Sequence, residues 1–141
     1  MSYNPFSLEN KTILVTGASS GIGHATALEC SKMGANVIIV GRNRERLQDT
    51  FENLQGDNNM KIEADLTNYQ EIENLVGSIP KVDGTVLCAG KGETSPVMYS
   101  SREKFDEVFN INFFSTVEIL RLLYKKKKIV NINLVRTNCV S

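Results

Sequence analysis

The sequence predicts an α/β fold in which a doubly wound parallel sheet carries helices on both faces. Two observations support it: short apolar strand segments alternate with helical segments, and the first strand runs directly into a glycine-rich turn. Strands that are covered by helices on both faces favour parallel pairing with right-handed crossovers. We expect the sheet to be truncated after its fourth or fifth strand.

The first strand, helix and second strand form one βαβ unit. Residues 11–17 are an apolar strand segment, and residues 21–34 have apolar side chains at helical spacing. Gly34 can end this helix because glycine adopts positive φ readily, and residues 35–41 then read as a second buried strand.

The remaining segments continue the alternation. Residues 42–54 and 69–79 read as helices, and residues 60–65 and 82–90 read as strands. A long helix over residues 101–126 has an apolar stripe that we expect to face the sheet. The members of this stripe are Phe105, Val108, Phe109, Asn112, Thr116, Ile119 and Leu123.

Composition excludes several classes of protein. The 141 residues are 41% apolar and 23% charged, which suits a single domain over residues 1–141, and 16 Lys and Arg balance 16 Asp and Glu. Without net positive charge we expect no nucleic-acid partner and no membrane partner. No segment resembles a signal peptide or approaches the roughly 18 apolar residues of a membrane span, so we expect a cytoplasmic protein.

The cysteines do not suggest a metal site. Cys30, Cys88 and Cys139 are odd in number and have no Cys-x-x-Cys spacing. We therefore expect reduced thiols in place of disulfides or zinc ligands.

The segment TGASSGIG after the first strand predicts a dinucleotide site of the Rossmann type. Gly17 permits a tight turn, and Gly21 and Gly23 permit a close approach of the backbone to the ligand and to the strand. The N–H groups at the helix start would face a diphosphate, and Ser19 and Ser20 can add hydroxyl hydrogen bonds. A structural loop is the alternative, which the strand, turn and helix context disfavours.

TGASSGIG, with ADLTN at residues 64–68 and LCAG at residues 87–90, resembles the short-chain dehydrogenase/reductase family. The resemblance extends from about residue 11 to residue 123 and covers the cofactor-binding half of a complete family member. It implies that the glycine segment binds the diphosphate of NAD or NADP. The residues with this implied role are Gly17, Ser19, Ser20, Gly21, Ile22 and Gly23.

The end of the second strand predicts NADP in preference to NAD. An acidic residue about 20 positions after the glycines would bind the ribose hydroxyls of NAD, but the sequence has Gly41, Arg42 and Asn43 there. A guanidinium can hold a 2′-phosphate in bidentate fashion, and Gly41 leaves room for it. The alternative is a solvated arginine, because Arg44 and Arg46 lie close by in similar surroundings.

Asp65 and Leu66 follow the third strand, where the resemblance implies that the Asp65 carboxylate accepts a hydrogen bond from the adenine amino group. A helix cap is the competing role for Asp65, although Thr67 or Asn68 would fill it equally well.

Ala89 and Gly90 keep the small-residue backbone path that the family has beside its cofactor. Leu87 and Cys88 replace two asparagines of the family, so only a packing and backbone role is implied for them. Cys88 is not expected to act as a nucleophile, because no basic residue near it in the sequence would lower the pKa of its thiol.

Asn112 interrupts the apolar stripe of the long helix. A buried amide needs several partners, so its side chain is either satisfied locally or holds water for proton transfer. FDEVFNIN resembles the family segment whose final asparagine supports a proton relay, which implies a catalytic role for Asn112.

Tyr124 and Lys128 have the spacing of the family's catalytic pair, but Tyr124 lies about 18 Å beyond Asn112 along a helix. We expect a solvated lysine cluster at a helix C-terminus instead.

Beyond the lysines the resemblance fades. Residues 128–134 resemble the family's fifth strand, but Asn133, Leu134 and Val135 stand where its catalytic serine would, and no tyrosine and lysine pair follows. Four consecutive lysines imply an adenine-rich coding tract, and our hypothesis is that a reading-frame slip made residues 129–141 an aberrant tail. Sequencing of the coding DNA tests this hypothesis.

The resemblance implies an NADP(H)-dependent oxidoreductase that reduces a carbonyl or oxidises an alcohol of a small molecule, impaired by truncation. The alternative is a non-catalytic dinucleotide-binding fragment. A sheet that stops at its fourth or fifth strand leaves an apolar edge and an uncovered helix face. We therefore expect a homo-oligomer or an aggregation-prone chain.

Overall fold

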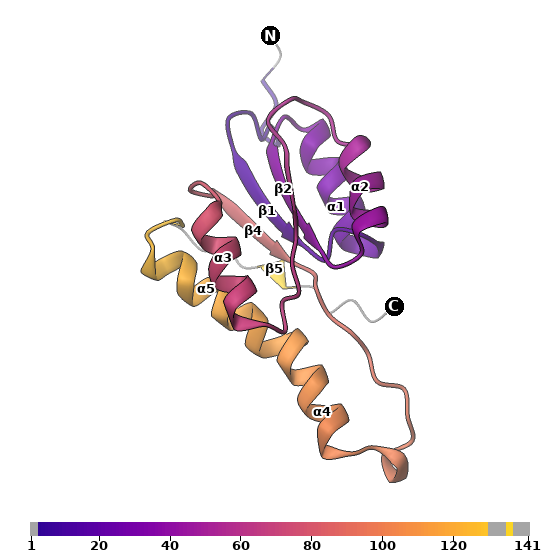
Figure 1. Cartoon of the computed structure of the whole chain (residues 1–141). Coiled ribbons are helices and arrows are strands. Elements are labelled where there is room, and N and C mark those ends of the chain that lie inside the picture. Colours follow the sequence, from indigo (N-terminus) through magenta and orange to yellow (C-terminus); the bar gives the residue numbers. More distant parts are fainter. Residues whose placement is uncertain (1–2, 130–134, 137–141) are drawn as a thin grey trace.

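A five-stranded parallel sheet lies between two layers of helices in the computed structural model, which describes residues 3–129 and 135–136 (Figure 1). The strands are β1 (Thr12–Thr16), β2 (Asn36–Gly41), β3 (Met60–Glu63), β4 (Gly84–Leu87) and β5 (Val135–Arg136). Their order across the sheet is β3-β2-β1-β4-β5, and every neighbouring pair is parallel. The predicted doubly wound parallel sheet is thus confirmed.

The helices divide between the two faces of the sheet. They are α1 (Gly21–Lys32), α2 (Arg44–Glu52), α3 (Tyr69–Ser78), α4 (Arg102–Phe109) and α5 (Ser115–Lys125), with a 3₁₀ turn at Val97–Tyr99 and a π-helical segment at Asn110–Phe114. Figure 1 shows α1 and α2 on one face, and α3 and α5 on the other. Within the described residues, no helix has the length and apolar character that crossing a membrane requires.

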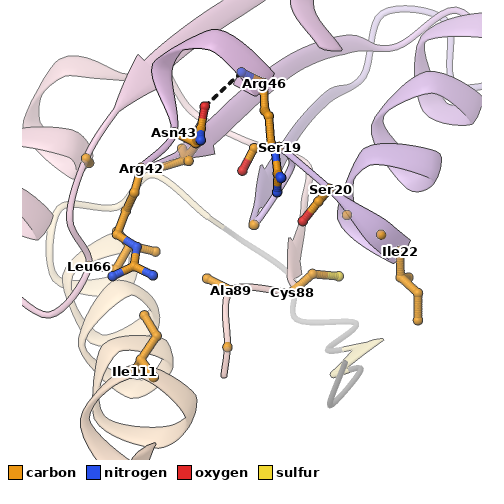
Figure 2. A pocket seen from close by; sticks show the side chains of 17 residues that line it. Ser19, Ser20, Ile22, Arg42, Asn43, Arg46, Leu66, Cys88, Ala89 and Ile111 are labelled. Atoms are coloured by element: carbon orange, nitrogen blue, oxygen red, sulfur yellow. Dashed lines mark hydrogen bonds between the residues drawn. The ribbon is translucent and has the colours of Figure 1, made fainter. Parts of the chain in front are cut away.

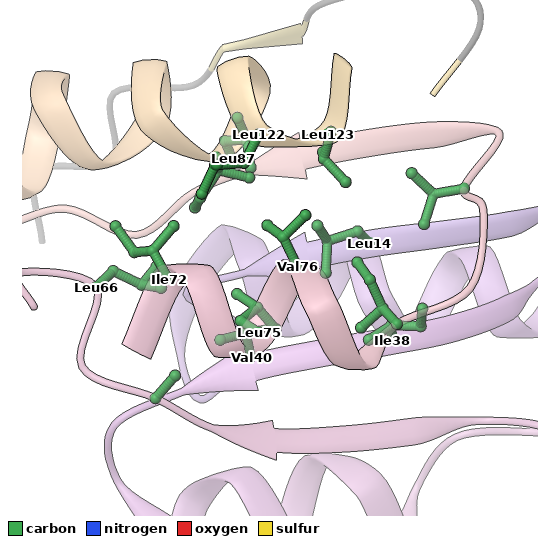
Figure 3. Packing of buried hydrophobic residues seen from close by; sticks show 14 of the residues in the cluster. Leu14, Ile38, Val40, Leu66, Ile72, Leu75, Val76, Leu87, Leu122 and Leu123 are labelled. Carbon is green, nitrogen blue, oxygen red and sulfur yellow. The ribbon is translucent and has the colours of Figure 1, made fainter. Parts of the chain in front are cut away.

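Alternate side chains of the central strands enter separate cores. Val37 and Ile39 of β2 belong to the cluster under α1 and α2, whereas Ile38 and Val40 belong to the cluster under α3 and α5. This follows from the period of two residues in a strand. Figure 3 shows the second cluster, where Ile72, Leu75 and Val76 of α3 meet Leu122 and Leu123 of α5.

The strand register brings three strand ends to one edge of the sheet. Thr16 is paired with Val40 of β2 and with Leu87 of β4, so β1, β2 and β4 end side by side. The strand order reverses between β1 and β4, and open parallel sheets bind ligands outside the carboxyl ends of the strands at such a point. The fold therefore locates the candidate site at this edge.

The long helix differs from the prediction. Its apolar stripe was expected to face the sheet throughout, yet Phe105 and Phe109 are 45% and 57% exposed. The expectation is wrong there because α4 extends away from the sheet (Figure 1). The π-helical segment then rotates the buried face, since a π turn holds more residues than an α turn. Ile111, Ser115 and Ile119 form the buried row beyond Phe109.

Several element boundaries also differ. α2 begins at Arg44 because the side chain of Asn43 caps it, accepting a hydrogen bond from the Arg46 N–H at 3.0 Å. Arg42 therefore lies between β2 and α2, outside the helix. Strands β3 and β4 end earlier than expected. Of the expected fifth strand, residues 128 and 129 are not in a strand, and residues 130–134 lie outside the described residues, as do residues 137–141 of the expected tail.

Lys128 has a structural role that the sequence did not reveal. Its ammonium donates to the carbonyl oxygens of Val76, Gly77 and Ile79 at 2.7, 3.1 and 2.6 Å, at the C-terminus of α3. The expectation of a solvated cluster is therefore wrong for Lys128, although residues 125–127 are exposed. Positive charge at a helix C-terminus also interacts favourably with the helix dipole.

The lysine run lies at the amino end of β4. The Lys128 carbonyl accepts a hydrogen bond from the Val82 N–H at 2.8 Å, just before that strand begins. Tyr124, in the last turn of α5, consequently lies near the edge of the sheet opposite the strand ends described above. It does not meet Asn112.

We predict that Lys128→Met destabilises the protein by about 1–3 kcal/mol, because charge-assisted hydrogen bonds to the end of α3 are lost. Urea unfolding measures the effect. Lys125→Met is the matched control, since Lys125 is exposed, and it should change the free energy of unfolding by less than about 0.5 kcal/mol. Equal unfolding midpoints for the two variants would contradict the role of Lys128.

Candidate functional site

A cavity of about 500 Å³ opens at the carboxyl ends of the strands (Figure 2). This volume is within the usual range for sites that bind small molecules. Ten of the twelve residues that the sequence proposed for the site line it. They are Gly17, Ser19, Ser20, Gly21, Ile22, Gly23, Arg42, Leu66, Ala89 and Gly90. Asp65 and Asn112 are not among the lining residues.

The glycine turn forms one wall of the cavity, and each of its glycines is required for a different structural reason. Gly17 and Gly21 have φ of 67° and 58°, a conformation that favours glycine. A Cβ atom on Gly23 would lie 2.2 Å from the carbonyl oxygen of Gly17, and one on Gly17 would lie 2.7 Å from the Ala89 nitrogen. Only glycine lets β1, α1 and the segment after β4 approach this closely.

The N-terminus of α1 is well suited to face an anion. The first N–H groups of a helix have no intrahelical partners, and the residues that carry them here line the cavity. Ser20 is the N-cap residue, and its hydroxyl makes no capping hydrogen bond. The partial positive charge of the helix N-terminus adds to this preference. The geometry fits the diphosphate of a dinucleotide.

Two arginines approach the cavity from the second strand and helix. Arg42 follows β2 directly, and Arg46 belongs to the first turn of α2. In Figure 2 the Arg46 side chain extends towards Ser19 and Ser20. Gly41 allows this part of β2 to lie close to the turn, because a Cβ atom there would lie 3.0 Å from the Ser19 hydroxyl oxygen.

Arg46 is the main residue that sequence reasoning missed, since it was judged equivalent to Arg44. Arg44 is exposed and does not line the cavity. The available signal was helical geometry: residues two positions apart point to different sides of a helix, so Arg44 and Arg46 cannot both face the cavity. Cys88 and Ile111 also line the cavity. The resemblance of residues 87–90 had implied a packing role for Cys88, whereas the apolar Ile111 gave no sign of its position.

Asp65 does not cap a helix. The side-chain oxygen of Asn68 caps α3 instead, accepting two N–H hydrogen bonds of 2.9 and 3.4 Å. The Asp65 carboxylate accepts bonds from the Thr67 hydroxyl at 2.7 Å and from the Thr67 N–H at 3.0 Å. These bonds lower the pKa of Asp65, and the positive charge of Arg42 lowers it further. Asp65 is therefore an anionic acceptor at neutral pH, lining a hollow that it shares with Arg42.

Asn112 lies in the π-helical segment and is satisfied locally, one of the two alternatives from the sequence. Its side-chain oxygen accepts from the Lys91 N–H, and its side-chain nitrogen donates to the Lys91 carbonyl, both at 2.8 Å. The Lys91 ammonium also forms an ion pair with Glu107 of α4 at 2.7 Å. Together these contacts fix the chain directly after Gly90. The catalytic role of Asn112 stays a prediction.

Comparison with known proteins yields a consistent group of relatives. A family model of short chain dehydrogenases matches residues 11–137. The 3-oxoacyl-(acyl-carrier-protein) reductase of Rickettsia bellii is 38% identical over 119 residues, which are 84% of this chain and 49% of that protein. An uncharacterised oxidoreductase of Staphylococcus epidermidis is 30% identical over 118 residues, 81% of this chain and 51% of that protein. The chain spans about half the length of the curated relatives it matches.

Solved structures give the same result. The 3-ketoacyl-(acyl-carrier-protein) reductase of Brucella melitensis in complex with NADH has a TM-score of 0.77 at 30% identity, covering 84% of this chain and 51% of that chain. The L-sorbose reductase of Gluconobacter frateurii in complex with NADPH and L-sorbose has a TM-score of 0.79 at 26% identity, covering 85% and 48%.

Proposed function

The chain belongs to the short-chain dehydrogenase/reductase family of oxidoreductases, and from this premise we propose that its cavity binds NADP(H). The observation that carries the proposal is that two arginines, Arg42 and Arg46, line the cavity where β2 ends. Two guanidiniums at the end of β2 suit a 2′-phosphate, which NADP has and NAD lacks. Relatives in complex with NADH and with NADPH are both known, so the preference has to come from this chain's own residues.

Each lining segment has a proposed part in binding. The glycine turn, with Ser19, Ser20 and Ile22, holds the diphosphate, and Asp65 with Leu66 lies beside the adenine. Ala89 and Gly90 keep a narrow backbone path beside the rest of the cofactor. The cradle fits, since any side chain at Gly17 or Gly23 would collide with backbone. The bound cofactor would supply hydride chemistry with a carbonyl or alcohol substrate.

A second candidate function is dinucleotide binding without catalysis. Among the described residues that line the cavity, none is a tyrosine or a lysine, and Asn112 is held by the Lys91 backbone. A proton donor must lie within hydrogen-bond reach of the reacting oxygen. In this second proposal, residues 1–141 form one cytoplasmic NAD(P)-binding domain that binds the cofactor and does not turn over substrate. If the chain is catalytic instead, we propose that Asn112 takes part in the proton relay.

We predict that Arg42→Ala weakens NADPH binding about 10- to 100-fold and changes NADH binding little, because one or two charge-assisted hydrogen bonds to the 2′-phosphate are lost. Calorimetric titration with both cofactors measures this. Arg44→Ala is the matched control, because Arg44 is an exposed arginine two residues further along the chain and lies outside the cavity wall. Equal weakening of both cofactors by Arg42→Ala would show that Arg42 does not contact the 2′-phosphate.

Turnover separates the two candidate functions. If the chain binds without catalysis, purified protein of verified sequence binds NADPH, and the absorbance of NADPH stays constant with a panel of ketones and aldehydes. A loss of absorbance that scales with protein concentration and is abolished by Gly23→Ala would instead establish the oxidoreductase. Gly23→Ala serves as the control because its Cβ atom would collide with the glycine turn.

We also propose that the chain associates with copies of itself through exposed side chains of α4, the π-helical segment and the first turn of α5. Large apolar side chains that are 44% to 57% exposed lie there, a patch expected to be covered. They are Phe105, Phe109, Phe113, Phe114 and Val117.

Light scattering should give a mass above that of a monomer, and Phe109→Glu should lower this mass. A monomeric wild-type protein at high micromolar concentration would contradict this.

A further inference from the structure

Helices α1 and α2 are joined by a polar contact next to the glycine turn. The Nδ1 atom of His24 lies 2.7 Å from the hydroxyl oxygen of Thr50. That hydroxyl lies 3.0 Å from the Ala18 carbonyl oxygen and 3.1 Å from the Arg46 carbonyl oxygen. Thr50 and Ala18 are both fully buried. Neither His24 nor Thr50 lines the cavity, and neither was predicted to belong to the site.

The direction of these hydrogen bonds follows from the number of protons. Thr50 has one hydroxyl proton, so donating it to His24 would deprive the buried Ala18 carbonyl of the Thr50 donor. If His24 carries its proton on Nδ1, it donates to Thr50, and Thr50 shares its own proton between the two carbonyls. Each polar group then has a partner. The geometry therefore assigns the Nδ1–H tautomer to neutral His24.

The contact acts on the turn through a single peptide group. The Ala18 carbonyl and the Ser19 N–H belong to the same planar trans peptide, in which they point in opposite directions. When Thr50 holds the carbonyl, the Ser19 N–H is directed away from Thr50, and Ser19 lines the cavity. The Ala18 N–H is held as well, because it donates to the Val40 carbonyl at 3.1 Å. The turn is thus fixed from β2 and from α2.

We propose that Thr50, itself oriented by His24, is a positioning residue that directs the Ser19 N–H towards the diphosphate of the cofactor. This inference rests on the proposed dinucleotide site. The diphosphate is common to NADPH and NADH, so Thr50 affects the two cofactors equally. In this respect its effect differs from that of Arg42, which is proposed to act on the 2′-phosphate alone.

Thr50→Val tests the proposal, since valine has the shape of threonine without the hydroxyl. We expect NADPH and NADH to bind more weakly by the same factor, on the order of tenfold. Thr50→Ser, which restores a hydroxyl, should recover wild-type affinity. Calorimetric titration with each cofactor measures both effects.

Ser31→Ala is the matched control for helix packing. The Ser31 hydroxyl also connects α1 to the segment that follows α2, accepting from the Gln55 N–H at 3.1 Å. It lies at the opposite end of α1 from the turn, roughly 15 Å away at 1.5 Å per residue. This variant should lower the melting temperature and leave both affinities unchanged.

Three results would overturn the proposal: unchanged affinities in Thr50→Val, a loss confined to NADPH, or an equal loss in Ser31→Ala. Two measurements on the free protein need no cofactor. The Ala18 amide, which donates to the Val40 carbonyl, should exchange faster with solvent in Thr50→Val than in wild type. In wild type, ¹⁵N NMR at alkaline pH should show the single histidine as the Nδ1–H tautomer, and the Nε2–H form would overturn the assignment.

These free-protein measurements also separate the two proposals. If wild-type protein binds neither cofactor, the proposed function fails, while amide exchange still decides whether Thr50 holds the turn. If wild-type protein binds both cofactors and Thr50→Val binds them equally well, only the inference about Thr50 fails.

Discussion

The close approach of α1 to the end of β1 is the constraint on which the site depends. A side chain on Gly23 would meet the Gly17 carbonyl at 2.2 Å, so the contact is between backbone and backbone. It brings the positive end of a helix to the point where the strand order reverses. The cavity lies around this point, because the turn, the end of β2 and the segment after β4 all line it.

Charge is distributed along the cavity in a way that matches an extended ligand. The amino end of α1 lies at one side, and Arg42 and Arg46 lie where β2 ends. Asp65, with its lowered pKa, lines a second hollow that Arg42 also lines. A ligand with two separate anionic groups and one hydrogen-bond donor fits this spatial order of charges better than a compact anion would.

The glycine turn could be predicted from the sequence because the spacing of its glycines reflects backbone contacts and positive φ angles that few other structures require. Helical geometry indicates that Arg44 and Arg46 face different sides, but which of them faces the cavity depends on how α2 packs on the sheet. The prediction that the apolar stripe faces the sheet was wrong at Phe105 and Phe109 because of helix geometry as well. Periodicity assumes one unbroken helix opposite a sheet, whereas α4 extends away from the sheet and a π-helical segment shifts the phase. Lys128 was missed because its partners are about 50 residues away.

All residues of the cavity wall lie between Gly17 and Ile111. The side chains of α5 that close the hydrophobic core under that wall, Ile119, Leu122 and Leu123, come later in the chain. On a ribosome the wall residues that the structure describes are therefore synthesised before these last side chains of the core. A nascent chain would contain those wall residues while it still lacked part of the packing that keeps them in one conformation.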